Sequence, residues 1–128
     1  MVEMNVSSDP PHVLIVDDNL DASEVLAMLV EAEGFTAATA HTLGEAREQI
    51  VAQRPRMVLL DVNLPDGNGL NLLAEIKDDQ QTAGIGVVIL SGMADDRLKQ
   101  EAHLLGAAAV IAKPLDHEQL TALLDAAR

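Results

Sequence analysis

Four short apolar runs in this chain each end in a polar residue that can take part in chemistry. Short apolar runs that alternate with longer helical patterns are typical of parallel strands buried on both faces. The carboxyl ends of such strands share one edge of the sheet, and ligands bind in the crevice at that edge. The residues that follow the four runs are carboxylates, a hydroxyl and an ammonium: Asp17 and Asp18, Asp61, Ser91 and Lys113. We therefore expect a site for a metal ion and a phosphoryl group at this edge.

Each of these residue types has a distinct part in phosphoryl chemistry. Asp17, Asp18 and Asp61 at one edge repel one another unless a cation lies among them. Oxygen ligands without Cys or His favour Mg²⁺, which keeps several waters and takes few carboxylates. Asp61 stands alone at the end of its run, where a carboxylate can act as a nucleophile and form an aspartyl phosphate. Lys113 can neutralise the phosphoryl oxygens, and Ser91 can donate a hydrogen bond to one of them.

Each residue also has an ordinary structural interpretation. An acidic pair after a strand often only caps the next helix, and a single Asp or a Ser-Gly pair is common in turns. A lysine before a proline is commonly solvated. The functional interpretation therefore depends on the conjunction of these residues at four successive strand ends within 128 residues.

The length and composition indicate one globular domain. A chain of 128 residues with 48% hydrophobic residues can bury one core, which must be aliphatic because Phe35 is the only aromatic residue. The absence of cysteine excludes disulfides, thiolate metal sites and a Cys nucleophile, and it fits a cytosolic protein. The histidines lack the HExxH spacing and are expected at the surface or its boundary: His12, His41, His103 and His117.

The charge and hydropathy of the chain exclude several classes of partner. Eight basic and 21 acidic residues give a formal charge of −13 at pH 7. Such a surface repels phosphate backbones and anionic lipids, so we expect no direct nucleic-acid binding. No apolar stretch approaches the roughly 18 residues of a membrane span, and the N-terminus lacks a signal-peptide pattern. We therefore expect a cytoplasmic protein without a membrane interaction.

The chain is expected to consist of a mobile leader, residues 1–11, followed by five strand–helix units. The strands are predicted at about 12–16, 36–40, 57–61, 85–90 and 109–112. The helices are predicted at about 21–33 and 42–53, from 70, from 95 or 96 to 105, and from 117. Such an alternation requires right-handed crossovers, with helices on both faces of a parallel sheet. Residues 64–69 are interpreted as a turn.

Local patterns predict details of three helices. The first is expected to bury a stripe of four side chains: Val25, Leu26, Leu29 and Val30. Thr42 and Glu45 are interpreted as a capping box that opens the second helix. Asp116 is expected to cap the last helix.

The motifs at these strand ends resemble those of response-regulator receiver domains, the phosphorylated half of bacterial two-component signalling. The resemblance covers residues 12–128, and its matching segments are 14–19, 60–65, Gly69, 90–92, 106–107 and Lys113-Pro114. It implies a flavodoxin-like, doubly wound, five-stranded parallel sheet in the order 2-1-3-4-5, with helices on both faces. It also implies a cis peptide bond before Pro114.

The resemblance implies a role for each site residue. Asp61 would accept the phosphoryl group from the histidine of a sensor kinase or phosphotransfer protein, with Lys113 and Ser91 contacting that group. Asp18 and Asp61 would bind Mg²⁺ directly, Asp17 would assist, and Asn63 would offer its backbone carbonyl. The phosphorylation state would be relayed to an output domain or effector protein. The chain would then be a signalling domain and not an enzyme, since it would catalyse only its own phosphorylation and dephosphorylation. Whether it forms a homodimer is left open.

One position departs from the pattern of that family. Receivers usually carry Tyr or Phe three residues before the lysine, and this chain has Val110 there. In the family, the ring swings inward when the Ser or Thr moves toward the phosphate. Valine is short and stiff at χ1, so it cannot make that movement. We expect the phosphorylation chemistry to be unchanged and the usual relay to the surface to be altered.

Three other classes of protein require motifs that this chain lacks. A haloacid-dehalogenase-like phosphatase needs Asp-x-Asp after its first strand, but Asp17 is followed two residues later by Asn19. A flavodoxin needs aromatics around its flavin, and the chain has no Tyr or Trp. Nucleotide binding needs a P-loop or a full GxGxxG, and residues 67–69 lack the third glycine. Intact Asp18, Asp61 and Lys113 argue against a phosphorylation-silent docking module, but Val110 leaves that alternative open. Whether an output domain follows Arg128 is also left open.

Overall fold

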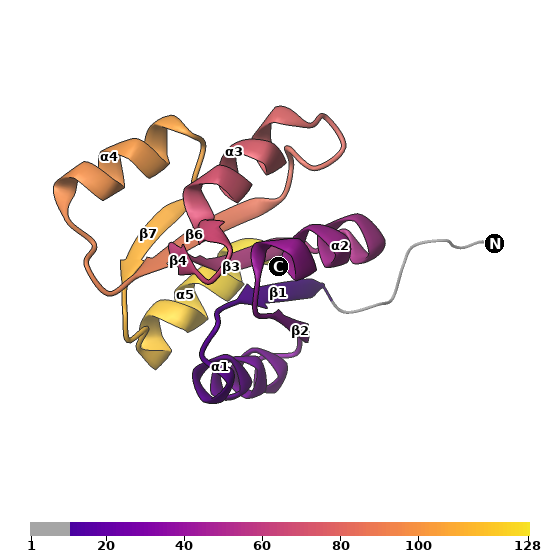
Figure 1. The fold of residues 1–128 in the computed structure, drawn as a ribbon. Helices are drawn as coiled ribbons and strands as arrows, with labels where there is room; N and C mark the ends of the chain where they lie inside the picture. Colours follow the sequence, from indigo (N-terminus) through magenta and orange to yellow (C-terminus); the bar gives the residue numbers. More distant parts are fainter. Residues whose placement is uncertain (1–10) are drawn as a thin grey trace.

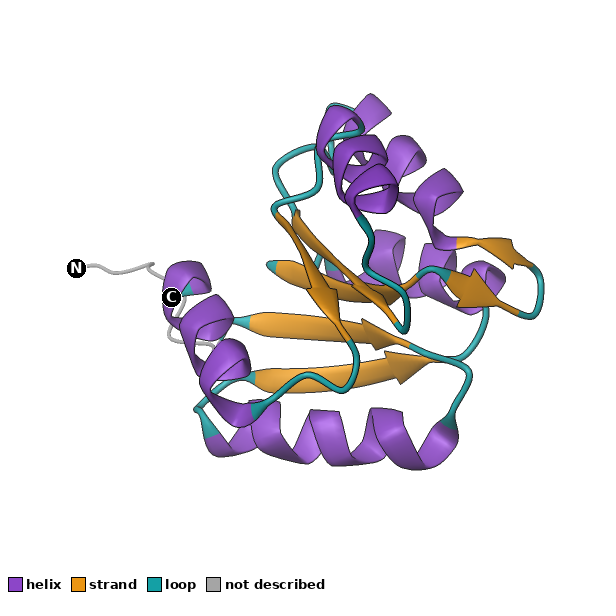
Figure 2. Ribbon diagram, turned by 90° about the vertical axis from the view of Figure 1, so that its left-hand side faces the viewer, coloured by secondary structure: helices purple, strands orange, loops and turns teal. Residues whose placement is uncertain are grey.

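A computed structural model describes residues 11–128, so the predicted leader lies outside the described residues except for Pro11. A five-stranded parallel sheet forms its centre, with helices on both faces (Figures 1 and 2). The strands are β1 (His12–Val16), β2 (Thr36–Ala40), β3 (Met57–Asp61), β6 (Gly86–Ser91) and β7 (Ala109–Ala112). Their order is β2-β1-β3-β6-β7, which confirms the expected order 2-1-3-4-5.

The five helices are arranged in two layers. They are α1 (Leu20–Ala32), α2 (Leu43–Gln53), α3 (Gly69–Asp78), α4 (Asp96–Leu104) and α5 (His117–Ala127). Side chains of α2, α3 and α4 enter one core cluster, and those of α1 and α5 enter the other. Successive side chains of β1 alternate between the two clusters, because side chains of a strand point to opposite faces: Leu14 lies in the first and Ile15 in the second.

Side-chain caps start all five helices. The capping side chains are those of Asn19, Thr42, Asn68, Asp95 and Asp116, and each accepts a hydrogen bond from a backbone amide of its helix. Asp116 and Gln119 form a complete capping box. The box predicted at Thr42 is only half formed, because the carboxylate of Glu45 accepts from the amide of His41 instead of the amide of Thr42.

Two predictions of local structure were wrong. Residues 64–69 are not a turn throughout. The turn is confined to residues 65–66, which join β4 (Asn63–Leu64) to β5 (Gly67–Asn68) in an antiparallel hairpin, and Gly69 already begins α3. Val25 does not join the buried stripe of α1, because its side chain faces a cavity and is 57% exposed. Leu26 and Leu29 are half-buried against the core, and Val30 is fully buried. The histidines lie at the surface or its boundary, as expected.

Candidate functional site

The carboxyl ends of the central strands bring the predicted site residues to one edge of the sheet. Val16 pairs with Leu60 and Asp61 pairs with Leu90, so the carboxylates that end β1 and β3 lie side by side. Ser91 ends β6, and the amide of Lys113 donates to its carbonyl at 2.8 Å. The peptide bond between Lys113 and Pro114 is cis, as the family resemblance implied.

Lys113 forms ion pairs with two of these carboxylates. Its Nζ donates to Oδ2 of Asp17 and to Oδ2 of Asp61, both at 3.1 Å. Asp17 and Asp61 are 4% and 6% exposed, so neither has much access to water. Burial by itself lowers the pKa of Lys113, but the hydrogen bonds and charges of Asp61 and Asp17 raise that pKa overall. The ammonium therefore stays charged and compensates the buried carboxylates.

The second oxygen of each buried carboxylate is held by the backbone. Oδ1 of Asp17 accepts from the amide of Asn19 at 3.0 Å, and Oδ1 of Asp61 accepts from the amide of Asn63 at 3.2 Å. Each carboxylate thus has one oxygen on Lys113 and the other on an amide two residues further along the chain. This arrangement fixes the orientation of both groups before any ligand arrives.

The acidic cluster has the composition of a divalent-cation site. Asp17, Asp18 and Asp61 each offer an oxygen atom, and these atoms lie within 4.8 Å of one another. Asp18 is exposed, so the cluster opens to solvent on one side. Carboxylate oxygens without a sulfur or imidazole ligand suit a hard cation such as Mg²⁺. The donor set therefore fits Mg²⁺ on its own chemistry.

Gly69 allows the chain to pass close to the end of β3. A β-carbon at this position would overlap the carbonyl oxygen of Asp61. The amide of Gly69 donates to the carbonyl of Val62 at 2.7 Å, which closes the segment that begins at Asp61. The glycine is thus required by a close approach of two backbone segments at the candidate nucleophile.

Ser91 is buried beside the carboxylates and is linked to the loop that follows it. The residue is 4% exposed, and its Oγ accepts from the amide of Met93 at 3.0 Å. That bond uses an acceptor position, so the hydroxyl hydrogen can still be donated to another group. Val110 is half-buried and packs against the core cluster on the α4 side.

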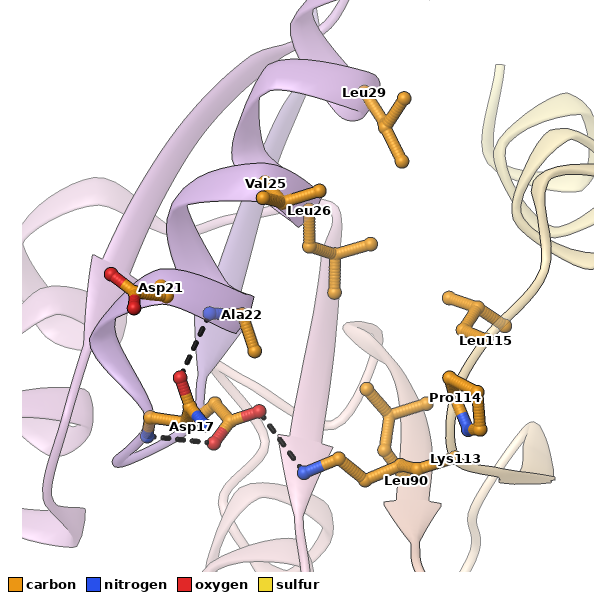
Figure 3. Close-up of a pocket in the computed structure, with 11 residues that line it drawn as sticks. Asp17, Asp21, Ala22, Val25, Leu26, Leu29, Leu90, Lys113, Pro114 and Leu115 are labelled. Carbon is orange, nitrogen blue, oxygen red and sulfur yellow. Dashed lines mark hydrogen bonds and ion pairs between the residues drawn. The ribbon is translucent and has the colours of Figure 1, made fainter.

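An apolar cavity adjoins the site, and the sequence patterns did not predict it. It has a volume of about 640 Å³ and lies between α1 and the segment that follows Lys113. Figure 3 shows Leu26 and Leu29 of α1 facing Leu115, with Asp17 and Lys113 at one end of the cavity. The sequence signal nearest to it was the apolar stripe predicted on α1, because three members of that stripe line the cavity: Val25, Leu26 and Leu29.

Known proteins match this chain over most of its length. The family model described as the response regulator receiver domain matches residues 13–125 of this chain. The phosphate regulon transcriptional regulatory protein PhoB of Pseudomonas aeruginosa is 32% identical over 89% of this chain, and the chain spans only 50% of that relative. A probable chemotaxis protein CheY of Rhizobium etli is 32% identical, and the match covers 89% of both chains.

One similar solved structure contains a phosphorylated aspartic acid and a bound metal ion. A response regulator from Burkholderia pseudomallei, determined with a phosphorylated aspartic acid, a calcium ion and citrate, has a TM-score of 0.81 and 27% identity. The match covers 92% of this chain and 66% of that one. In the described part of the chain, no helix is both long and apolar enough to cross a membrane. The chain belongs to the response regulator receiver domains, signalling domains that are phosphorylated on an aspartate and interact with histidine kinases and output domains.

Proposed function

We propose that Asp61 is the phosphoacceptor of this receiver domain. The observation that carries this proposal is the ion pair of 3.1 Å between Lys113 Nζ and Oδ2 of Asp61, a carboxylate 6% exposed at the end of β3. The ammonium and the amide of Asn63 orient the carboxylate, so little reorganisation is needed for attack. Phosphorylation on an aspartic acid in the structurally similar Burkholderia protein supports the same chemistry here.

The transfer we propose is a displacement at phosphorus. A carboxylate oxygen of Asp61 attacks the phosphorus of a phosphohistidine and forms the P–O bond of an acyl phosphate. The P–N bond breaks, and its electron pair stays on the imidazole nitrogen of the donor. Lys113 then exchanges its bond to Asp61 for a phosphoryl oxygen, and Ser91 donates its hydroxyl hydrogen to another. Attack of water on the same phosphorus breaks the P–O bond to Asp61, whose carboxylate keeps the electron pair. Inorganic phosphate leaves, and the proton lost by the water passes to the phosphate or to solvent.

We also propose which residues hold Mg²⁺. They are the carboxylates of Asp17, Asp18 and Asp61 and the backbone carbonyl of Asn63. Mg²⁺ bound there would neutralise charge on the transferring phosphoryl oxygens. The calcium ion in the Burkholderia structure is consistent with a divalent cation in this family.

The donor is proposed to be a sensor histidine kinase or a phosphotransfer protein. A protein donor that reaches Asp61 must cover the edge of the sheet, where the apolar cavity begins beside Asp17 and Lys113. The exposed Val25 of α1 gives such a donor an apolar surface to bury.

We propose that the phosphorylation state is relayed to an output domain or a separate effector protein. We also propose that the protein acts in the cytoplasm, as response regulators generally do.

The decisive experiment measures labelling by a small phosphodonor. Wild-type protein incubated with Mg²⁺ and acetyl phosphate should gain one phosphoryl group by intact-mass spectrometry. Asp61→Asn should gain none, because an amide cannot form the acyl phosphate. Asp125→Asn, which removes an exposed carboxylate on α5, is the control and should label like wild type. Equal labelling of Asp61→Asn would overturn the assignment, and an unlabelled wild type would favour the phosphorylation-silent docking module.

A further inference from the structure

The β4–β5 hairpin is a closed segment that begins and ends at the candidate nucleophile. It leaves β3 after Asp61 and returns at Gly69, whose approach to the carbonyl of Asp61 leaves no space for a side chain. Its first residue, Asn63, donates its amide to Oδ1 of Asp61 at 3.2 Å. The position of the hairpin, together with the ion pair to Lys113, therefore sets the orientation of the Asp61 carboxylate.

The hairpin is too small to hold this position alone. Its ladder consists of two residue pairs, Asn63 with Asn68 and Leu64 with Gly67. Even longer isolated two-stranded hairpins are marginally stable in water. Leu64 anchors one strand of the hairpin in the core cluster. The ladder adds little, so the backbone of Asn63 also depends on support of the hairpin tip by another part of the fold.

That support comes from the N-terminus of α2. Oδ1 of Asp66, at the hairpin tip, accepts from the amide of Leu43 at 2.8 Å, and Oδ2 accepts from the amide of Gly44 at 3.1 Å. Gly67 lies against the same helix end, where a β-carbon would come within 2.9 Å of Cδ1 of Leu43. The bond from Leu43 is the main cause that lowers the pKa of Asp66, so its carboxylate is ionised at neutral pH. An anion is also favoured there by the helix dipole.

We propose that Asp66 is a positioning residue for the phosphorylation site: it ties the hairpin to α2 and so fixes the backbone of Asn63. This inference rests on the proposed function, because Asn63 matters through its amide on Asp61 and its carbonyl toward Mg²⁺. Asp66 itself touches neither the nucleophile nor the acidic cluster. Its effect should therefore be seen in the affinity for Mg²⁺, in the rate of phosphorylation and in the protection of the Asn63 amide.

The chain offers a matched control at the same helix end. Thr42 also caps α2, by accepting from the amide of Glu45 at 3.0 Å, but it makes no hydrogen bond to the hairpin. Thr42→Ala and Asp66→Ala thus each remove side-chain acceptors from the start of one helix. Only Asp66→Ala releases the hairpin. Thermal melts would establish that both variants fold.

Three measurements test the proposal. By calorimetry, Asp66→Ala should bind Mg²⁺ about tenfold more weakly than wild type, since loss of a supporting contact around a metal site typically costs 10- to 100-fold. Its labelling by acetyl phosphate at a fixed Mg²⁺ concentration below saturation should slow by a similar factor. In metal-free protein, hydrogen exchange at the Asn63 amide should be faster. Thr42→Ala should match wild type in all three measurements.

Asp66→Asn separates position from charge. Its amide oxygen can still accept from Leu43, so most of the Mg²⁺ affinity should return. A value as low as that of Asp66→Ala would overturn the positioning role in favour of a simple charge effect. Wild-type behaviour of Asp66→Ala, or equal losses in Thr42→Ala, would also overturn it. None of these outcomes would affect the assignment of Asp61, which stands or falls with the labelling of Asp61→Asn.

Discussion

The ammonium of Lys113 lies 3.1 Å from Oδ2 of Asp61 and joins the ends of β7 and β3 across the sheet edge. A lysine at the edge of a sheet would be expected to bury little and to matter for signalling more than for folding. The structure contradicts the first expectation, because the side chain is only 30% exposed and also pairs with Asp17. Lys113 thus acts as an internal counter-ion for two buried carboxylates.

Replacing Lys113 by Ala should therefore lower the stability of the metal-free protein by about 2 kcal/mol, because two buried carboxylates lose their counter-ion, while the partial exposure of the lysine keeps the loss below that of a fully buried pair. Mg²⁺ should recover most of this loss by supplying positive charge at the same place. Thermal melts in EDTA and in Mg²⁺ measure the difference. Lys99→Ala, at an exposed position of α4, is the control and should melt like wild type in both buffers. A loss of equal size with and without Mg²⁺ would contradict the counter-ion role.

Replacing Asp18 by Asn should have the opposite effect on the metal-free protein. Removing one of three crowded carboxylates relieves repulsion and should raise stability, by only a few tenths of a kcal/mol because Asp18 is exposed and screened by water. The rise in melting temperature on adding Mg²⁺ should shrink, since a ligand stabilises only as far as it binds the folded state. Asp21→Asn, a nearby exposed carboxylate outside the cluster, controls for net charge. A less stable metal-free Asp18→Asn protein with a full response to Mg²⁺ would refute this account.

Gly69→Ala should disturb both stability and phosphorylation. A methyl group there must displace the carbonyl of Asp61, and overpacking of this kind costs about 1–3 kcal/mol. The shift moves the candidate nucleophile, so labelling by acetyl phosphate should slow as well. Gly84→Ala is the matched control, because a β-carbon at that position meets nothing within 4 Å. Denaturant unfolding and mass spectrometry of both variants would check this, and equal behaviour of the two would disprove the steric role.

The sequence predicts the assembly of the site better than it predicts the support of that site. Asp17, Asp61, Ser91 and Lys113 could be placed together because parallel strands that follow helices must end at one edge of the sheet. The order of the strands came from the family resemblance, since the apolar pattern alone does not say which strands are neighbours.

The sequence could not show contacts between segments that are distant in the chain. Asp66 belongs to a Pro-Asp-Gly turn by every local signal, and its partners on α2 lie 22 and 23 residues earlier. Val25 fits the apolar stripe of α1, but it lines a cavity together with Pro114 and Leu115 and stays 57% exposed. Both differences depend on tertiary packing, which periodicity does not encode.

The relay of the phosphorylated state is predicted to run through the loop after Ser91 rather than through β7. The amide of Met93 donates to Oγ of Ser91, so a hydroxyl that turns toward a phosphoryl oxygen draws residues 92–94 with it. Val110 has no ring to move, so we expect the contacts of Ser91 and Lys113 to be the ones that differ between the two states.

Amide chemical shifts with and without beryllofluoride test this relay. The wild-type response should centre on residues 91–95 and the start of α4. It should be lost from α4 in Ser91→Ala, which keeps the carboxylates but removes the moving hydroxyl. Val110→Tyr should extend the response to β7, because a ring at this position adds a group whose packing can differ between the states. An intact α4 response in Ser91→Ala, or a wild-type response centred on β7, would show that the signal leaves the site by another route.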